Sequence, residues 1–160
     1  MHGDRIYTNG ADRDNLVAPK FEKTIEEVLG GVHVLNFRGE QWGDEGVVAL
    51  TKWYMPLCVS LQVLYLGETG MGDTAVKALG KTLGAMRALK VLDLLQNDVG
   101  DIGAVALAAG LKAPLEALNL IANPRISKVG KAALRKAAAA IGRQRSAAKT
   151  GLTVYFDGDN

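Results

Sequence analysis

The sequence has few of the residues that build catalytic or metal sites. Its 160 residues include one cysteine, Cys58, and two histidines, His2 and His33. A single cysteine cannot form an internal disulfide, and the chain lacks the paired-cysteine, HExxH and GxSxG motifs of zinc sites and hydrolases. We therefore expect no metal, no cofactor, no small-molecule substrate and no enzymatic activity. Cys58 lies between Leu57 and Val59, which favours a buried thiol.

Long apolar runs are also missing. No stretch of about 18 apolar residues occurs, so we expect no membrane-spanning segment and no membrane partner. The first fifteen residues include charged side chains such as Asp4, Arg5 and Asp14 and show no apolar stretch typical of a secretory signal. These two absences predict a cytoplasmic, intracellular protein.

Acidic residues are absent from one part of the chain. Between Ala117 and Phe156 there are none, but there are eight basic residues, whereas 11 basic and 15 acidic residues precede Ala117. Such a cluster can attract RNA, another polyanion or an acidic protein surface, although no aromatic residue is interleaved to stack bases. A solvated helix face is the other interpretation, and the sequence leaves these open. The candidate polyanion-binding residues are Lys128, Lys131, Arg135, Lys136, Arg143 and Arg145.

An internal repeat organises most of the chain. A short segment with the pattern LxxLxL recurs, and the central leucines Leu35, Leu64, Leu92 and Leu118 are 29, 28 and 26 residues apart. The alternation of apolar positions indicates a short strand in each unit. The segments are 32–37, 61–66, 89–94 and 115–120, with a final, incomplete one at 151–156.

A helix signal follows each of the first three strands. A Gly-Asp pair precedes an apolar run with helical spacing, and its aspartate lies nine residues after the strand leucine, at Asp44, Asp73 and Asp101. We expect each aspartate to be the N-cap of its own helix, because its carboxylate can accept bonds from the first N–H groups. In the fourth repeat the turn between strand and helix is one residue longer and contains Pro124, so we expect a local bulge there and Ser127 as the cap.

The repeat unit LxxLxLxx(N)x(V/M)GDxGxxxLxxxL resembles the ribonuclease-inhibitor subfamily of leucine-rich repeats, from about Val32 to Asn160. The resemblance implies an α/β solenoid, a short horseshoe with parallel strands on its concave side and helices on its convex side. Residues 32–160 would form about four full units plus a final strand. Residues 1–31 would form an N-terminal tail and a capping helix over Phe21–Leu29, which ends at Gly30-Gly31.

The ladder asparagine of this family matches Asn97 and Asn123, which are expected to satisfy backbone groups in the turn that leaves each strand. Glu40 and Thr69 occupy this position in the earlier repeats and Asp159 in the last, so we expect looser turns at the N-terminal end. Trp42 takes the position of Met71 and Val99, which predicts a core residue. For Trp53 and Tyr54 we favour packing over a binding site.

One glycine-rich segment has the position of a phosphate-binding loop. Residues 67–74, GETGMGDT, follow a strand and precede a helix. Asp73 stands where the phosphate-binding lysine of that motif would stand, and it would repel a phosphate. The Gly-Asp pair recurs in the neighbouring repeats, which helix capping predicts and nucleotide binding does not.

The outward-facing strand residues are unusually apolar for a solvated sheet face. Alternation along each strand would place Tyr65, Val91, Leu95 and Ile121 in an exposed apolar patch on the concave surface. Patches of this kind, with a polar rim, often mark protein interfaces. The sequence therefore predicts a non-catalytic module that binds another protein, alone or as a small subunit of a larger assembly, unless a tail covers this face. The candidate residues are Arg38, Tyr65, Val91, Asp93, Leu95, Asn119, Ile121 and Tyr155.

Overall fold

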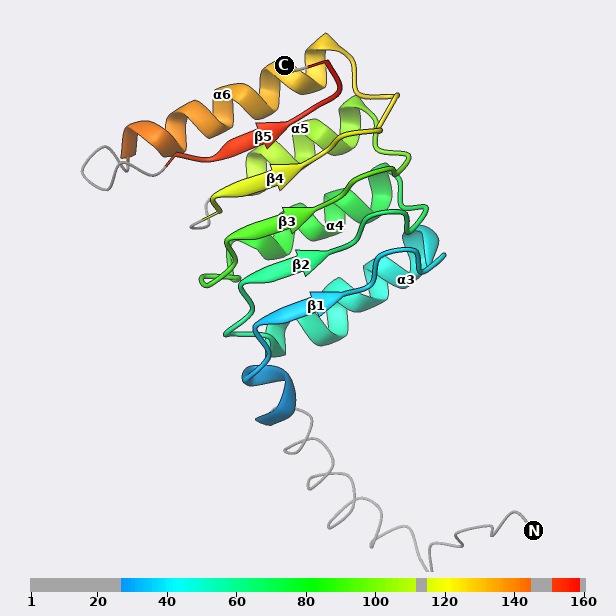
Figure 1. Cartoon of the computed structure of the whole chain (residues 1–160), viewed down its shortest axis with the longest axis vertical. Helices are drawn as coiled ribbons and strands as arrows, with labels where there is room; N and C mark the ends of the chain where they lie inside the picture. Colours follow the sequence, from blue (N-terminus) through cyan, green and yellow to red (C-terminus); the bar gives the residue numbers. More distant parts are fainter. Residues whose placement is uncertain (1–26, 112–114, 145–150, 159–160) are drawn as a thin grey trace, which may run out of the picture.

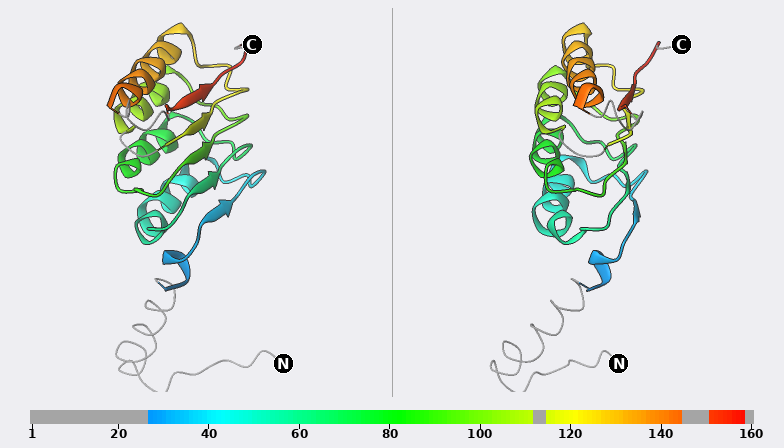
Figure 2. Two further views of the ribbon diagram at one scale, coloured as in Figure 1. Left: turned by 60° about the vertical axis from the view of Figure 1, so that its left-hand side comes forward. Right: turned by 90° about the vertical axis from the view of Figure 1, so that its left-hand side faces the viewer.

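A computed structural model describes residues 27–111, 115–144 and 151–158. The described strands form one parallel sheet in the order β1-β2-β3-β4-β5, so each strand pairs with the next one along the chain. The helices all lie on one side of this sheet (Figures 1 and 2). The predicted α/β solenoid is confirmed. The strands are β1 Val34–Asn36, β2 Val63–Tyr65, β3 Val91–Asp93, β4 Ala117–Asn119 and β5 Thr153–Tyr155.

The helical layer also follows the chain order, because α3 packs on α4, α4 on α5 and α5 on α6. In the first repeat the helix is short and continues as a π-helical segment, Leu50–Tyr54, and a 3₁₀ segment, Met55–Leu57. Pro56 lies in this last segment and has no N–H to continue an α-helix. The helices are α3 Gly43–Ala49, α4 Asp73–Leu83, α5 Asp101–Gly110 and α6 Lys128–Gln144.

The strand leucines align in one buried row. Leu64, Leu92 and Leu118 are in register with one another and are fully buried. From the helical side, Leu79 and Leu107 complete this core and are equally inaccessible to solvent. The core therefore runs continuously between sheet and helices, as a stack of repeats requires.

The two asparagines act as predicted. Asn97 Oδ1 accepts hydrogen bonds from the N–H groups of Thr69 (3.1 Å) and Met71 (3.2 Å), and its Nδ2 donates to the carbonyl groups of Leu66 (2.9 Å) and Leu94 (3.1 Å). Asn123 joins the third and fourth repeats in the same way, with bonds to the Val99 N–H and the Leu94 carbonyl. These buried amides satisfy backbone groups that no sheet or helix bond reaches.

The aspartates cap helices, but not their own, and here the prediction is wrong. Asp73 is the first residue of α4, and its Oδ1 accepts bonds from the N–H groups of Gly100 (2.7 Å) and Gly103 (2.9 Å) at the start of α5. The extended N-cap position of α4 belongs to Gly72 instead. A carboxylate one residue further on points sideways along the solenoid. It therefore reaches the first turn of the neighbouring helix.

The same link recurs along the solenoid. Asp44 accepts bonds from the Gly72 and Ala75 N–H groups of α4, and Asp101 accepts them from Ser127 and Gly130 at the start of α6. Each aspartate therefore stabilises the helix of the next repeat through the partial positive charge of its N-terminus.

The fourth repeat has its cap where predicted. Ser127 precedes α6, and its Oγ accepts a hydrogen bond from the Val129 N–H at 3.1 Å. The Ser127 hydroxyl in turn donates to Asp101 Oδ2 at 2.6 Å. Ser127 thus replaces the glycine of the other repeats and adds a side-chain bond to the link between α5 and α6.

The N-terminal end is less completely buried. Phe37 and Trp42 pack against each other with ring centroids 4.6 Å apart, but both remain partly accessible, as does Leu35. Trp42 therefore contacts the core as predicted. Trp53 and Tyr54 are 62% and 49% exposed, but Tyr54 still borders the hollow beside Leu50 and Cys58. Residues 27–30 are helical, and most of the predicted capping helix lies outside the described residues.

Candidate protein-interaction surface

The concave face is formed by the outward side chains of the sheet. No described element covers it, because the helices α3–α6 occupy the opposite side (Figure 2). All-parallel sheets are usually covered on both faces. This sheet has one face packed against helices and one face left open to a second layer.

The central apolar residues of this face are only half-buried. Tyr65, Val91, Leu95 and Ile121 lie there as expected, but each is partly shielded by neighbouring strands and turns. The predicted patch is therefore less exposed than alternation alone indicates. The large apolar side chains that the face exposes most are Val34 in β1 and Tyr155 in β5.

Polar residues of the concave face hold the strand ends in place. Asp93 is only 6% exposed, and its Oδ1 accepts a bond from the Leu95 N–H at 3.1 Å. Asn119 does the same for Ile121, also at 3.1 Å. Asp93 was expected to be exposed, and this expectation is wrong, because its carboxylate turns toward the Leu95 N–H. Residue type and spacing do not reveal this contact.

An ion pair lies at the rim of the face beside β1 and β2. Arg38 Nε donates to Glu68 Oε1 at 2.9 Å, and Gln41 Nε2 donates to the Glu68 carbonyl, also at 2.9 Å. Arg38 was predicted from the sequence, whereas Glu68 and Gln41 were missed because they belong to turns. Both members of the pair are substantially accessible, so the pair contributes little to stability and remains available to a partner.

In each turn that follows a strand, one residue has a left-handed backbone conformation, with positive φ. It lies four positions after the central residue of the strand. Glycine takes this position at the two ends, as Gly39 and Gly158, but the inner turns use Glu68, Gln96 and Ala122 with φ of 59°, 53° and 57°. Left-handed backbone is unfavourable for residues other than glycine. The inner repeats therefore hold a row of conformationally restricted turns along one edge of the concave face.

The basic residues of α6 have two different environments. Lys128, Lys136 and Arg143 are exposed. Lys131 and Arg135 lie over the buried ring of Phe156, 5.3 Å and 5.4 Å from its centroid.

Lys131 Nζ also donates to the Asp157 carbonyl at 3.1 Å. Lys131 and Arg135 thus help close the core at the C-terminal end, which limits their use as polyanion ligands. Arg145 lies outside the described residues.

The side chains most suited to catalysis or ligand binding are held in contacts within the fold. His33 is exposed and its Nδ1 lies 2.7 Å from the Gly31 carbonyl oxygen, while burial raises the pKa of the Cys58 thiol. Asp73, in the glycine-rich segment 67–74, accepts hydrogen bonds from the Gly100 and Gly103 N–H groups at the start of α5. Within the described ranges, His, Cys, Asp and Glu side chains form no group suited to a metal ion, and no helix is long and apolar enough to cross a bilayer.

Three comparisons agree with this architecture. Residues 85–108 match a family described as leucine-rich repeat. Over 80 residues the chain is 40% identical to human "NACHT, LRR and PYD domains-containing protein 12", and 32% and 34% identical to the ribonuclease inhibitors of Sus scrofa and Mus musculus. These matches cover 50% of this chain, but only 8% of the first relative and 18% of each inhibitor.

A solved structure of Leiomodin-1 Actin-Binding Site 2 superimposes with a TM-score of 0.67 and 17% identity. The superposition covers 88% of this chain and 80% of the other. At this identity the similarity concerns the fold alone.

Proposed function

We propose that the chain is a non-catalytic module of the ribonuclease-inhibitor-like leucine-rich-repeat type, which binds another protein on its concave face. Several similar proteins are named for a binding role, as a ribonuclease inhibitor or an actin-binding site. Neither name indicates a chemical reaction.

The observation that carries the proposal is the open face of the parallel sheet. Aromatic and aliphatic side chains line it at Tyr65, Val91, Leu95 and Ile121. Tyr65 and Val91 are paired within the sheet, and the N–H groups of Leu95 and Ile121 are bonded to the Asp93 and Asn119 side chains. A partner would therefore cover apolar area without leaving backbone groups unpaired. Area of this kind contributes about 25 cal/mol for each Å² removed from water.

The polar groups around these side chains indicate the chemistry of the partner. Arg38 and Glu68 at one end can exchange their ion pair for contacts across an interface, and Tyr155 at the other end is exposed. An apolar centre with a polar rim is the usual composition of a protein interface. We expect a partner surface with a protruding aromatic or aliphatic residue that enters the hollow of the horseshoe.

The test is a capture experiment with the double variant Tyr65→Ala/Leu95→Arg. The tagged chain and the variant are each incubated with extract of the native source, and bound proteins are quantified by mass spectrometry. A specific partner of the native chain should lose affinity at least about tenfold with the variant, because central apolar anchors dominate binding energy.

A matched control separates the concave face from the rest of the surface. Val59→Arg places the same charge on an exposed residue of the turn before β2, outside the strand face, and it should leave that partner bound. Both variants are checked for native secondary structure and urea stability. A partner retained by the folded double variant, or lost equally with Val59→Arg, would contradict the concave-face assignment.

A second candidate function is binding of RNA or another polyanion through α6. It is favoured by the exposed cations Lys128, Lys136 and Arg143, on a helix that contains no acidic residue. Labelled RNA is titrated at low and physiological salt, because phosphate contacts weaken steeply with ionic strength. Absence of binding at low salt removes this candidate.

A further inference from the structure

The convex surface over α4, α5 and α6 exposes charges of one sign only. Asp73 and Asp101 are the only acidic residues of these helices, and both are hydrogen-bonded to the backbone of the next repeat. Both carboxylates keep their negative charge, but they are half-buried and face the N-terminus of the next helix. The exposed charged side chains that remain are Lys77, Lys81, Lys128, Arg135, Lys136 and Arg143.

An apolar ridge runs through the middle of this basic surface. Ile102 and Val105 on α5 are 72% and 46% exposed, and Val129 on α6 is 64% exposed. The matched contacts of Asp44, Asp73 and Asp101 with the following helices show which helix positions are equivalent, and these include Thr74, Ile102 and Val129. By the same register Val105 corresponds to Lys77 of α4. The same convex positions are thus polar on α4 and apolar on α5.

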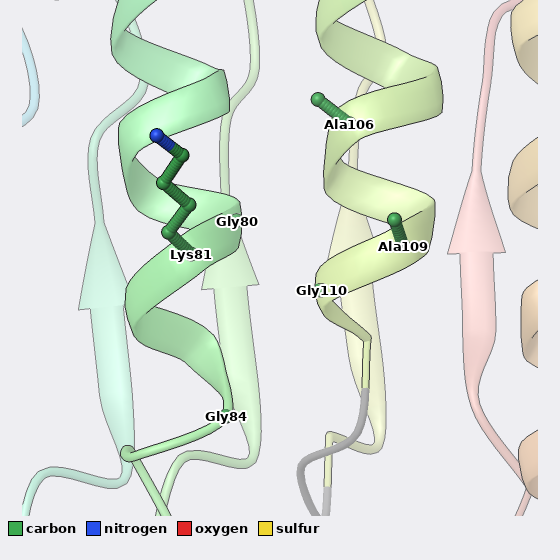
Figure 3. Close-up of a pocket in the computed structure, with 6 residues that line it drawn as sticks. All are labelled: Gly80, Lys81, Gly84, Ala106, Ala109 and Gly110. Atoms are coloured by element: carbon green, nitrogen blue, oxygen red, sulfur yellow. The ribbon is translucent and has the colours of Figure 1, made fainter.

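The surface beside this ridge is hollowed by close helix packing. A Cβ built on Gly80 would lie 2.9 Å from the Ala106 carbonyl oxygen, and one on Gly110 would clash with the Gly80 backbone. Between α4 and α5 a shallow hollow is lined by Gly80, Gly84, Ala106, Ala109 and Gly110, with Lys81 at its edge. Figure 3 shows Lys81 extended along α4, opposite the methyl groups of Ala106 and Ala109.

We propose that this convex surface, defined by the ridge Ile102–Val105–Val129 and the adjoining hollow, binds an acidic amphipathic helix of a partner protein. Such a helix would place its apolar stripe on the ridge and in the hollow, the usual helix-in-groove arrangement. Its flanking carboxylates would meet Lys77 and Lys81 on one side and Lys128 and Lys136 on the other. The site is on the opposite side of the molecule from the concave face, so both partners could bind together.

Other polyanions fit this surface less well. Helices α4, α5 and α6 contain no aromatic residue on which a base could stack, and the aliphatic ridge would separate a phosphate backbone from the lysines. A lipid bilayer is attracted by the same charges, but it is flat and gains mainly from large inserted side chains. The hollow is instead bordered by alanine and glycine, which permit close approach of a narrow helix.

The experiment uses a fluorescent helical peptide of about five turns, with leucines at i, i+3, i+4 and i+7 and glutamates on both flanks. Its counterpart replaces every glutamate by lysine. Fluorescence anisotropy with the full chain should show at least about tenfold tighter binding of the acidic peptide. Val105→Glu should weaken that binding at least about tenfold, because it removes apolar contact and repels the flanking carboxylates.

A matched control comes from the first repeat. Lys52→Glu makes the same charge change as Lys81→Glu at the equivalent helical position of the first repeat. It is one helix further from the ridge, in a hollow that it shares with Lys77 and Lys81. Lys81→Glu should weaken binding several-fold, and Lys52→Glu should have a clearly smaller effect. Circular dichroism and urea unfolding confirm that the variants fold. The concave double variant Tyr65→Ala/Leu95→Arg should bind the peptide normally.

Three outcomes would overturn the proposal. The first is equal binding of the acidic and basic peptides, and the second is binding of the acidic peptide that is unaffected by Val105→Glu in a folded protein. The third is a Val105-dependent interaction with vesicles of phosphatidylcholine and phosphatidylserine, or with single-stranded RNA, and none with the acidic peptide. It would assign the surface to a membrane or a nucleic acid.

Discussion

The first and third repeats have the same pattern of strand and helix, yet they are buried to different degrees. Leu92 and Leu94 in the third repeat are fully buried, whereas Leu35 and Phe37 at the same positions in the first are partly accessible. Among the described residues, the third repeat has neighbours on both sides and the first on one side only. In a solenoid, burial depends as much on the neighbours as on the residue itself.

The polar residues differ in the same way. Asn97 in the third repeat uses its amide oxygen and nitrogen to join two turns, and it is nearly inaccessible. Glu40 holds the corresponding place in the first repeat and is exposed. Thr69 in the second repeat is buried and donates to the Leu66 carbonyl at 3.0 Å. Looser turns were expected at both Glu40 and Thr69. Only Glu40 is exposed, whereas Thr69 is buried and hydrogen-bonded in its turn.

The largest expected effect compares the two strand leucines. Leu92→Ala should lower the free energy of unfolding by about 3–5 kcal/mol, because it leaves a cavity between two complete repeats. Leu35→Ala should lower it by only about 1–2 kcal/mol, because its side chain already contacts water. Both are measured by urea unfolding. Equal losses would show that the first repeat is packed as tightly as the third.

The next effect compares the ladder positions. Asn97→Ala should destabilise the protein by about 2–3 kcal/mol, since the backbone groups of Thr69, Met71 and Leu66 lose their partner. Glu40→Ala should change stability by less than about 0.5 kcal/mol. Asn97→Asp is the matched control: it keeps an acceptor but loses the donor, so it should not restore stability. A neutral Asn97→Ala would mean that water replaces the amide.

A smaller effect is expected at the left-handed turns. Gln96→Gly relieves about 1–2 kcal/mol of backbone strain. It also adds about 0.4–1 kcal/mol of unfolded-state entropy, so a net gain of about 0.5 kcal/mol is expected. The reciprocal change Gly39→Ala should destabilise the first repeat by a similar amount, because open space surrounds Gly39 and only its backbone is affected. Urea midpoints compare the two; destabilisation by Gln96→Gly would contradict the strain argument.

The smallest effect is pH-dependent and involves Asp101. A hydrogen bond from the Ser127 hydroxyl, together with bonds from backbone N–H groups, lowers the pKa of Asp101 below its usual range. Its stabilising contribution is therefore fully present above about pH 4, the usual pKa of an aspartate, and is lost as the pH falls through the lower pKa of the folded state.

The variant Asp101→Asn tests this contribution. It should lower the urea midpoint at pH 7 and have less effect in acid, so that the two stability curves converge at low pH. Ser127→Ala should weaken this convergence, because it removes the largest cause of the lowered pKa. Parallel curves for Asp101→Asn and the native chain would exclude the assigned role.

Much of the architecture was predictable from local pattern. The spacing of Leu64, Leu92 and Leu118 identified the strands, and the resemblance of the repeat to a known family identified Asn97 and Asn123 as ladder residues. The helix that each aspartate caps was not predictable in this way, because the position of the aspartate in the sequence is the same whether it caps its own helix or the next one. Only the lateral distance between repeats shows that Asp73 contacts Gly100 and not its own helix.

The candidate surfaces were also predictable only in part. Alternation along the strands placed Tyr65 and Leu95 on the concave face, since a side chain in a strand has only two directions. The sequence could not show that Asp93 turns back to the Leu95 N–H, or that Lys131 and Arg135 cover Phe156.

By itself, the sequence determined the repeat, the strand and helix order and the identity of the core leucines, because these depend on periodicities within one unit. Only the tertiary structure decided which side chains remain accessible. Accessibility depends on contacts between units whose residues lie 30 or 31 positions apart, such as Asp73 with Gly103 and Asn97 with Leu66.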